Sequence, residues 1–321
     1  MKRFSILMIF LMFATISLVA QTGDWRRYRH ELVFGAGTAE FMGDLGGGKG
    51  VGTHFVKDFD IQAGRWAFML GYGYKLTDRF ALRTAIYYGR VFGNDEFTPE
   101  PARNGRNLSF RSPIIELSEV VEFSIIREKF GYRYNSKHAR KLKATPNLYI
   151  FAGVGGFYFN PRGQYVPVVK DGTTGLPVLD AEGNTTPDES DPDYGKWYSL
   201  QPFGTEGQGV VSTRPKYSRI QMSIPFGVGL NCMLTKSWGI GFDFGFRYTL
   251  TDYIDDVSST YVDPAIFKDD PIARYFSNPD SKYRVGAGEQ RGDSNWNDAY
   301  MFLTIKVTYK LFSSRRGRSK F

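Results

Sequence analysis

Within the segment 299–312, residues 303–311 alternate apolar and polar side chains without a break, and this two-residue period constrains the fold more than any other feature of the sequence. Successive side chains of a β-strand point to opposite faces, so the pattern predicts a strand with two unlike faces. Odd positions from Met301 to Leu311 are apolar, whereas Thr304, Lys306, Thr308 and Lys310 are polar. We therefore expect one face to meet lipid and the other to line a polar lumen.

Seven further segments share this alternation. They cover residues 31–42, 65–75, 80–92, 114–126, 147–159, 218–232 and 239–251. Each has about the 9–11 residues that a tilted strand needs to cross a bilayer. An even number of such segments predicts an all-β fold, namely a transmembrane antiparallel up-and-down β-barrel of about eight strands with long extracellular loops.

Composition excludes the other class of membrane protein. Only 42% of the residues are hydrophobic, and after the first 20 residues no apolar run is long enough for a spanning helix. The 16% of aromatic residues and the 36 glycines suit a barrel, in which aromatic girdles mark the membrane interfaces. The single cysteine, Cys232, cannot form an internal disulfide, so a closed sheet has to hold the exported chain together.

The two ends of the predicted barrel differ. Lys2 and Arg3 followed by an apolar run up to Ala20 predict a signal peptide over 1–20, which leaves the barrel domain at 21–321. Short polar turns at 76–79 and 234–237 are expected in the periplasm, and long outer loops at 160–217 and 252–298 outside the cell. With an even strand count, both termini lie in the periplasm, and the basic tail 313–321 lies there too.

The inward-facing charges of this reading nearly balance. They are Arg83, Arg247, Lys306 and Lys310 against Glu116, Glu122 and Asp243. At about eight strands the interior is just wide enough for its own side chains, so we expect ion pairs to close the lumen. Glu119 does not fit, because its position points it at lipid, so we expect either a bulge that re-aims it or a different register.

Charges outside the strands separate by side. The predicted periplasmic rim is basic and carries Lys129, Arg133, Lys137, Arg140, Lys141, Lys143, Arg315, Arg316 and Arg318. The outer loops are rich in Asp and Glu. A net charge of +8 alone suggests nucleic acid, but an exported chain seldom meets any. We expect the rim to bind an acidic periplasmic protein, or else the headgroups of outer-membrane lipid.

Two segments resemble a known family beyond their periodicity. Residues 31–45 read Glu-Leu-Val-Phe-Gly-Ala-Gly-Thr-Ala-Glu-Phe-Met-Gly-Asp-Leu, and residues 247–263 run through Thr-Asp-Tyr into Asp-Asp-Val-Ser. Both resemble PorG-like outer-membrane proteins. The residues of the second segment that carry the resemblance are Arg247, Thr251, Asp252, Tyr253, Asp255 and Asp256.

The resemblance implies a component of the type IX secretion and gliding machinery. It implies a barrel that is held in the outer membrane and docked to a periplasmic ring, which consists of a lipoprotein and its partner. The loop 160–217 is longer than in that family, so the chain is either the core component or a relative with a specialised outer face.

Other site signals are weaker. Asp252, Asp255 and Asp256 could gather around Ca²⁺, but they match no EF-hand spacing, and a hydrogen-bonded turn is the preferred interpretation. The glycine-rich segment 43–50 lacks the Ser or Thr of a phosphate-binding loop. His30, His54 and His138 fall on different parts of the topology and cannot form one site. We expect no cofactor, no metal and no enzymatic activity.

Three alternatives to a secretion adaptor remain open. An independent binding barrel or adhesin would use its long extracellular loops to capture a ligand or surface. An outer-membrane enzyme would use His54 with a nearby carboxylate, Asp58 or Asp60. A soluble lipid-binding barrel would place apolar residues inside and polar residues outside, which is the reverse of the pattern at 239–251 and 299–312.

Overall fold

The computed structural model describes residues 24–45, 64–95, 106–128, 146–173, 177–180, 185–235, 237–268, 270–279 and 286–311. Its elements follow the chain in this order: η2 (Asp24–Arg27), β1 (His30–Met42), β2 (Arg65–Lys75), β3 (Phe80–Asn94), β4 (Ser109–Ile126), β5 (Pro146–Phe159), β6 (Arg162–Gln164), β7 (Trp197–Ser199), β8 (Ile220–Met233), β9 (Trp238–Thr249), η5 (Pro264–Phe267), α3 (Pro271–Ser277) and β10 (Ala299–Leu311).

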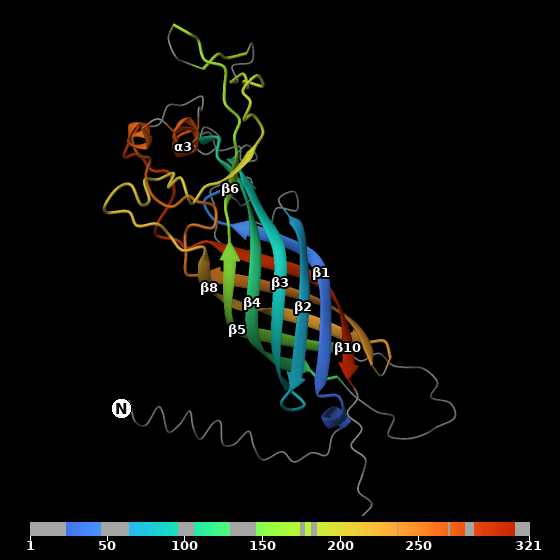
Figure 1. Ribbon diagram of the computed structural model, residues 1–321. Helices are drawn as coiled ribbons and strands as arrows, with labels where there is room; N and C mark the ends of the chain where they lie inside the picture. Colours follow the sequence, from blue (N-terminus) through green and yellow to red (C-terminus); the bar gives the residue numbers. More distant parts are fainter. Residues whose placement is uncertain are drawn as a thin grey trace, which may run out of the picture.

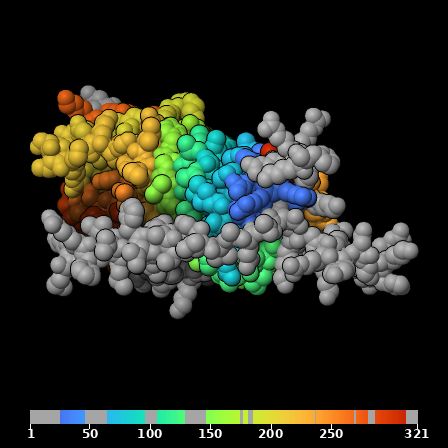
Figure 2. Space-filling model, turned by 90° about the horizontal axis from the view of Figure 1, so that it is seen from below, coloured from blue at the N-terminus to red at the C-terminus, as the bar shows by residue number. Residues whose placement is uncertain are grey.

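Eight of these strands close into a barrel. Each long strand pairs antiparallel with its neighbours in the order β3-β2-β1-β10-β9-β8-β5-β4, and the pairing of β3 with β4 completes the ring. The predicted eight-stranded antiparallel barrel is therefore confirmed. Figure 2 shows the N-terminal part of the described chain in blue, followed along the visible face by cyan and then green, as expected where consecutive strands follow one another around the wall.

The two ends of the barrel are built differently, and we call them the turn end and the head end. At the turn end the hairpins β2–β3 and β8–β9 close tightly. The hydroxyl of Thr77 accepts hydrogen bonds from the backbone N–H groups of Arg79 and Phe80, and that of Thr235 accepts from Ser237 and Trp238 in the same way. His30 pairs with Leu311, so the first and last strands also begin and end here (Figure 1).

At the head end the long segments fold into a compact outer head. We use this name for the described parts of 160–217 and 252–298. The sequence predicted loops there, but the head also contains β6, β7, η5 and α3, and β6 extends the sheet by pairing with β4 at Arg111. Figure 1 shows the head above the barrel, with a hairpin that projects beyond it. No described helix has the length and apolar character needed to cross a bilayer.

The strand faces follow the predicted alternation with one correction. Glu119 faces outward, level with Thr84 on β3 and Val154 on β5. The register irregularity of β4 lies at Ser124–Ile126, near the turn end, and does not re-aim Glu119. Both sequence-based explanations, a local bulge and a different register, are therefore wrong.

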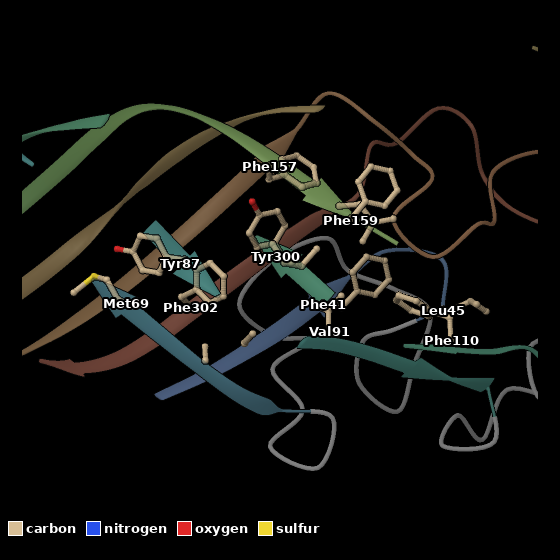
Figure 3. Close-up of a cluster of buried hydrophobic side chains, with 14 of the residues drawn as sticks. Phe41, Leu45, Met69, Tyr87, Val91, Phe110, Phe157, Phe159, Tyr300 and Phe302 are labelled. Atoms are coloured by element: carbon tan, nitrogen blue, oxygen red, sulfur yellow. The ribbon is translucent and has the colours of Figure 1, made fainter. Parts of the chain in front are cut away.

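The largest hydrophobic core lies inside the barrel. Phe41, Tyr87, Phe157 and Phe302 are buried there together with side chains from the head-end segments such as Leu45 and Ile254 (Figure 3). Tyr87 stacks on Phe302 with ring centroids 4.9 Å apart. The prediction of a polar lumen is thus wrong for this part of the barrel, because aromatic side chains from β1, β3, β5 and β10 fill it.

Candidate functional site: the closed lumen and the head-end mouth

A first group of charges crosses the lumen around Asp243. The carboxylate of Asp243 accepts from Arg83 and from the hydroxyl of Tyr149, and Lys306 Nζ lies 3.1 Å from Asp243 Oδ1. Arg83 Nε also lies 2.9 Å from Glu122 Oε1. These residues come from β3, β4, β5, β9 and β10, so the group ties opposite walls together. This group and the group centred on Glu116, described next, together form what we call the lumen network.

A second group is centred on Glu116. Arg247 Nε lies 3.3 Å from Glu116 Oε2, and the hydroxyl of Tyr300 donates to the same oxygen over 2.6 Å. The guanidinium of Arg247 lies between two rings, 4.6 Å from the centroid of Tyr87 and 4.6 Å from that of Phe302. This pair therefore joins the charged part of the lumen to the aromatic core. The structure thus brings together six of the seven inward charges that the sequence singled out, and the seventh, Lys310, lies at the turn end. The six are Arg83, Glu116, Glu122, Asp243, Arg247 and Lys306.

Sequence reasoning missed three members of the lumen. Tyr149 and Tyr300 were read only as aromatic residues, yet their hydroxyls complete the two groups. At the turn end Glu128 pairs with Lys75, at 3.3 Å, and with Lys310. Glu128 follows the last residue of β4, so a search for charges within the alternating segments could not find it. The only sequence feature that pointed to an acidic partner at the turn end was the inward position of Lys310.

The lumen is closed over its length. Charged groups that bind one another occupy the turn-end part, and the aromatic core occupies the head-end part. A cavity of about 20 Å³ lies at the mouth, lined by Leu45, Leu108 and Arg291, and it offers space for about one water molecule. An eight-stranded barrel filled in this way has no room for a diffusing solute.

The mouth of the barrel is where the two family-like segments meet. The backbone N–H of Leu45, just past β1, donates to Asp255 Oδ2 over 2.9 Å. Close by, Ile254 N–H donates to Asp298 Oδ2 over 2.8 Å, and Asp293 N–H donates to Asp44 Oδ2 over 2.8 Å. The segment at Leu45 crosses β3 so closely that a Cβ on Gly93 would lie 1.5 Å from the Leu45 carbonyl oxygen.

Four carboxyl groups gather at this crossing, and we call Asp44, Asp252, Asp255 and Asp298 the mouth cluster. Burial, followed by the charge of Asp44, raises the pKa of Asp255 well above its usual value. Burial and the charges of Asp255 and Asp252 do the same to the pKa of Asp298. For Asp252, burial raises the pKa to about 9. Asp252 therefore holds its proton at neutral pH, and the neighbouring carboxyl groups make ionisation of Asp255 and Asp298 less favourable, because like charges repel in a buried site.

Next to the mouth cluster, Glu206 and Arg291 fasten the head to the barrel. Glu206 is fully buried and accepts from the backbone N–H groups of Ser258 and Ser259, at 2.9 Å and 3.0 Å, and from Arg291 at 3.0 Å. Arg291 also donates to the Asp256 carbonyl over 2.8 Å. Neither residue stood out in the sequence, because each reaches its partners only through the fold of the loops.

The remaining residues of the family-like segment all lie at the mouth. Asp256 accepts from Thr205 and from Tyr217, each over 2.5 Å, and burial raises its pKa to about 6. The ring of Tyr253 stacks on Tyr217 with centroids 4.7 Å apart. Thr251 offers its carbonyl to the Asp298 N–H at 2.9 Å. The segment therefore joins the head to the barrel rim.

The calcium hypothesis for Asp252, Asp255 and Asp256 is not supported. In the part of the chain that the structure describes, no group of three or more carboxylate, His or Cys side chains is arranged to hold a metal ion. Asp255 and Asp256 instead accept hydrogen bonds from protein groups in different directions. The hydrogen-bonded turn preferred on sequence grounds describes them better.

A cluster of aromatic rings builds the upper part of the head. Tyr165 and Phe276 are buried with Leu200, and Tyr198, Tyr275 and Phe203 pack around them. At the base, Arg111 of β4 lies over the ring of Trp197, 3.6 Å from its centroid. Beyond this cluster the chain runs out and back as a hairpin that closes between Tyr165 and Lys196, whose backbones are hydrogen-bonded at 2.9 Å. Its described residues include Asp188, Glu189, Asp191 and Asp193, which are acidic.

The predicted periplasmic rim lies outside the described residues. This holds for Lys129, Arg133, Lys137, Arg140, Lys141 and Lys143, and for Arg315, Arg316 and Arg318. His54, His138, the signal peptide and most of the glycine-rich segment also lie outside them. His30 is described, and its Nδ1 lies 2.5 Å from the Tyr72 hydroxyl at the turn end.

The outer wall of the barrel is apolar. Phe68, Leu70 and Ile86 expose about half of their side chains, and Ile305 exposes 62%. Trp66 and Tyr88 lie toward the head end of this surface, with Tyr72, Tyr74 and Trp238 toward the turn end, so aromatic rings flank the aliphatic rows. A continuous apolar band bordered by aromatic rings is the surface of a barrel that spans a bilayer. The chain is a membrane β-barrel.

Comparisons with known proteins found one family model and several solved outer-membrane proteins that are similar to this chain. A family model described as a domain of unknown function, DUF6089, matches residues 3–175, more than half of the chain. No curated protein matches. Among solved structures, Neisserial surface protein A is 8% identical with a TM-score of 0.34, covering 88% of this chain and 97% of that one.

Two other outer-membrane proteins are similar in the same degree. Ail of Yersinia pestis, solved with a heparin analogue, is 8% identical with a TM-score of 0.35, covering 89% of this chain and 99% of Ail. A major outer-membrane protein of Thermus thermophilus is 11% identical with a TM-score of 0.34, covering 88% and 99%. At such scores the architecture rests on the strand pairing of this chain itself.

Proposed function

Because the chain belongs to the family described as a domain of unknown function, DUF6089, we propose its function from the barrel itself. It is a non-enzymatic barrel of the bacterial outer membrane that conducts no solute and acts by binding other proteins at its two ends. One observation carries this proposal. The lumen is filled by the lumen network and the aromatic core, and the head is fastened across the mouth. Only the surfaces remain available for function.

We further propose that the binding partner at the turn end belongs to the type IX secretion machinery. The resemblance of 31–45 and 247–263 to PorG-like proteins supports this, and the structure gives the two segments a common place at the mouth. The expected partners are the periplasmic ring lipoprotein and its partner. In this proposal the turn end faces the periplasm.

Charge supports a docking surface at that end. The basic segment 129–143 connects β4 and β5, and the basic tail follows β10; the flanking strand ends, Ile126, Pro146 and Leu311, all lie at the turn end. In the described part, Arg26 and Arg27 of η2 add exposed positive charge there. A concentrated positive surface would steer an acidic partner into contact and set its orientation.

The test is a mild-detergent pull-down of the tagged barrel from outer membranes, with mass spectrometry of the captured proteins. We expect periplasmic ring components with the native protein, and their loss when Arg133, Arg140, Lys141 and Lys143 are changed to Gln. The matched control changes the same number of exposed lysines on the head, Lys170, Lys196, Lys216 and Lys268, to Gln. This variant should capture the ring as the native protein does.

Recovery of the native barrel without any ring component would contradict the secretion proposal. Equal loss in the head control would show that total charge decides the capture, and the docking surface would then be wrong. The pull-down is made at moderate salt and repeated at high salt, because exposed charge pairs weaken as screening increases.

A second function is favoured by the outer head. Its acidic hairpin projects beyond β6 and α3 (Figure 1), which is the arrangement expected of a barrel that captures a ligand or surface outside the cell. The hairpin can be removed between Tyr165 and Lys196, where its two strands close, without touching Glu206. Loss of surface binding with secretion unchanged would favour this alternative over the adaptor.

A further inference from the structure

A carboxyl group lies in the middle of the lipid-facing surface. In the outward row of β4, Glu119 has Leu117 on one side and Val121 on the other, which are 57% and 44% exposed. Its neighbours across the strands are Thr84 and Val154. The Thr84 hydroxyl donates to Glu119 Oε2, and the structure gives Oε1 no hydrogen-bond partner among the described residues.

This position is costly for a barrel that meets only lipid. Charged side chains on the lipid face of a barrel destabilise it, and most strongly at mid-depth. Ionisable groups inside membranes for this reason usually pair with one another or mark a functional site. A wall built for lipid alone would carry an aliphatic residue here, as it does at Leu117 and Val121.

A hollow lies beside the carboxyl. Gly156 of β5 is opposite Leu117 on one side and Met222 of β8 on the other. A Cβ added to Gly156 would meet no atom within 4 Å. The neighbouring side chains are larger and project outward from the wall, with Val154 58% and Met222 57% exposed. Small residues between larger ones let the backbone of a second membrane segment approach closely.

We propose that this surface, formed by Thr84, Leu117, Glu119, Val154 and Gly156, is the interface of a homodimer in the membrane. Glu119 and Thr84 form a polar pair that holds both a hydrogen-bond donor and an acceptor. Under a two-fold axis this pair is complementary to its copy. A carboxyl group is least costly in lipid in its neutral form. Two neutral Glu119 groups facing each other each donate one hydrogen bond to the other, and each Thr84 supports its own carboxyl.

The basic side chains on the outer wall of a second copy lie at another depth. In the described strands they are Arg90, Arg111 and Arg162. Arg111 lies over Trp197 in the head, Arg162 is level with Arg111, and Arg90 is level with Pro113 near the same end. None of them lies at the depth of Glu119. The symmetric meeting of the two polar pairs therefore gives Glu119 a partner on another copy at its own depth without an ion pair.

The test is cross-linking and sedimentation of the full barrel in phosphatidylcholine vesicles and in detergent. In a Cys232→Ser background, Val154→Cys should form a disulfide-linked dimer. The matched control is Ile305→Cys, which is 62% exposed on β10 across the barrel and should stay monomeric. Glu119→Leu should lower the association constant roughly tenfold or more, since the two hydrogen bonds are lost.

Two more variants distinguish hydrogen bonding from bulk effects. Glu119→Gln keeps a donor and an acceptor and should dimerise within about threefold of the native protein. Gly156→Leu fills the hollow and should prevent dimerisation while Glu119 remains. Heat-modifiable migration on gels reports folding for each variant, and Glu119→Leu is expected to fold at least as well as the native chain, because it removes a polar group from lipid.

Native protein that sediments as a monomer at every protein-to-lipid ratio would overturn the proposal, and Glu119 would then face a lipid or another protein. Equal cross-linking at Val154→Cys and Ile305→Cys, or unchanged dimerisation of Glu119→Leu, would overturn it as well. The inference requires that the barrel inserts into membranes. Failure of insertion is seen separately, as protein absent from the floated vesicles.

Discussion

The backbone N–H of Leu45 donates a 2.9 Å hydrogen bond to the side chain of Asp255, although 210 residues separate them along the chain. Leu45 lies in the segment that leaves β1, and Asp255 lies in the segment that leaves β9. Asp255 accepts a second backbone hydrogen bond, from Val257 over 3.0 Å. One buried carboxyl therefore sets the position of two chain segments over the barrel mouth.

Replacing this carboxyl should loosen the head and leave the barrel intact. Asp255→Ala leaves the buried backbone N–H groups of Leu45 and Val257 without an acceptor, which costs about 1–3 kcal/mol for each. Asp255→Asn keeps one acceptor oxygen and so satisfies one of the two N–H groups, and it should cost less than Asp255→Ala. Limited proteolysis of the head measures the effect, and heat-modifiable migration reports the barrel. The control is Asp193→Ala on the hairpin of the head, where the half-buried carboxyl binds Lys196 and the hydroxyl of Tyr198.

If Asp255→Ala were cut no faster than Asp193→Ala, the hydrogen bonds at the mouth would contribute nothing to the stability of the head. If its barrel also failed to migrate as a folded species, the head and the barrel would unfold together, and the division between them would be wrong.

The head should become less stable as the pH rises. Burial raises the pKa of Asp252 to about 9, and burial and neighbouring carboxylates raise the pKa values of Asp255 and Asp298. The folded head thus binds more protons than the unfolded chain between about pH 4 and pH 9, and stability is lost through that range. For each extra proton that the folded head holds, the free energy of unfolding falls by about 1.4 kcal/mol per pH unit.

Hydrogen exchange of the head amides at pH 6 and pH 9, corrected for intrinsic rates, measures this loss. Asp252→Asn should flatten the dependence, because the variant has one titrating group fewer. A head that opened more readily at pH 6 than at pH 9 would show that the carboxyls of the mouth cluster are ionised and paired with cations instead.

Glu206 should be needed for the head to stay attached. It is buried and holds three partners, the N–H groups of Ser258 and Ser259 and the guanidinium of Arg291. Glu206→Ala leaves Arg291 as an unpaired buried charge, at a cost of about 3–5 kcal/mol. We expect protease cleavage within 200–215 in the variant and none in the native protein. Glu289→Ala, an exposed position on the same head, should behave as the native protein does.

The lumen network should stabilise the barrel itself. Arg83→Met removes the partner of Glu122 and one of the partners of Asp243, and should lower the free energy of unfolding by about 3–5 kcal/mol. The matched control is Arg127→Met, whose pair with Asp78 is exposed and worth about 0–1 kcal/mol. Urea unfolding in lipid vesicles compares the two. Equal midpoints would mean that the buried pairs add nothing beyond their surface counterpart.

The strands could be predicted because lipid enforces the alternation. Residues 65–75 match β2 at both ends, since the row from Trp66 to Tyr74 meets lipid along its length. The sequence placed the start of β4 at Ile114, whereas the strand begins at Ser109. Over 109–113 the strand leaves the apolar band and packs against the head, where Arg111 lies over Trp197. Alternation is no longer required there, and the pattern disappears.

The two-residue alternation predicted which charged side chains point into the lumen, but it could not predict which of them pair. The alternation shows that Arg83 and Asp243 point inward. They bind each other, although 160 residues separate them in sequence, because the barrel curves their strands around a common lumen. The aromatic core was missed because a polar lumen was expected, whereas Tyr300 and Phe302 occupy inward, even-numbered positions of β10. The mouth lies in loops without a period, so nothing local marks Glu206 or the meeting of Leu45 with Asp255.

The account rests most directly on the closed lumen, and conductance measures it. Purified barrel is inserted into planar lipid bilayers, insertion is confirmed by flotation of parallel vesicles, and the current is recorded under an applied voltage. We predict no steady single-channel conductance, because the lumen network and the aromatic core fill the passage. Stable open channels in the native protein would contradict the account and would make the barrel a conduit for solutes.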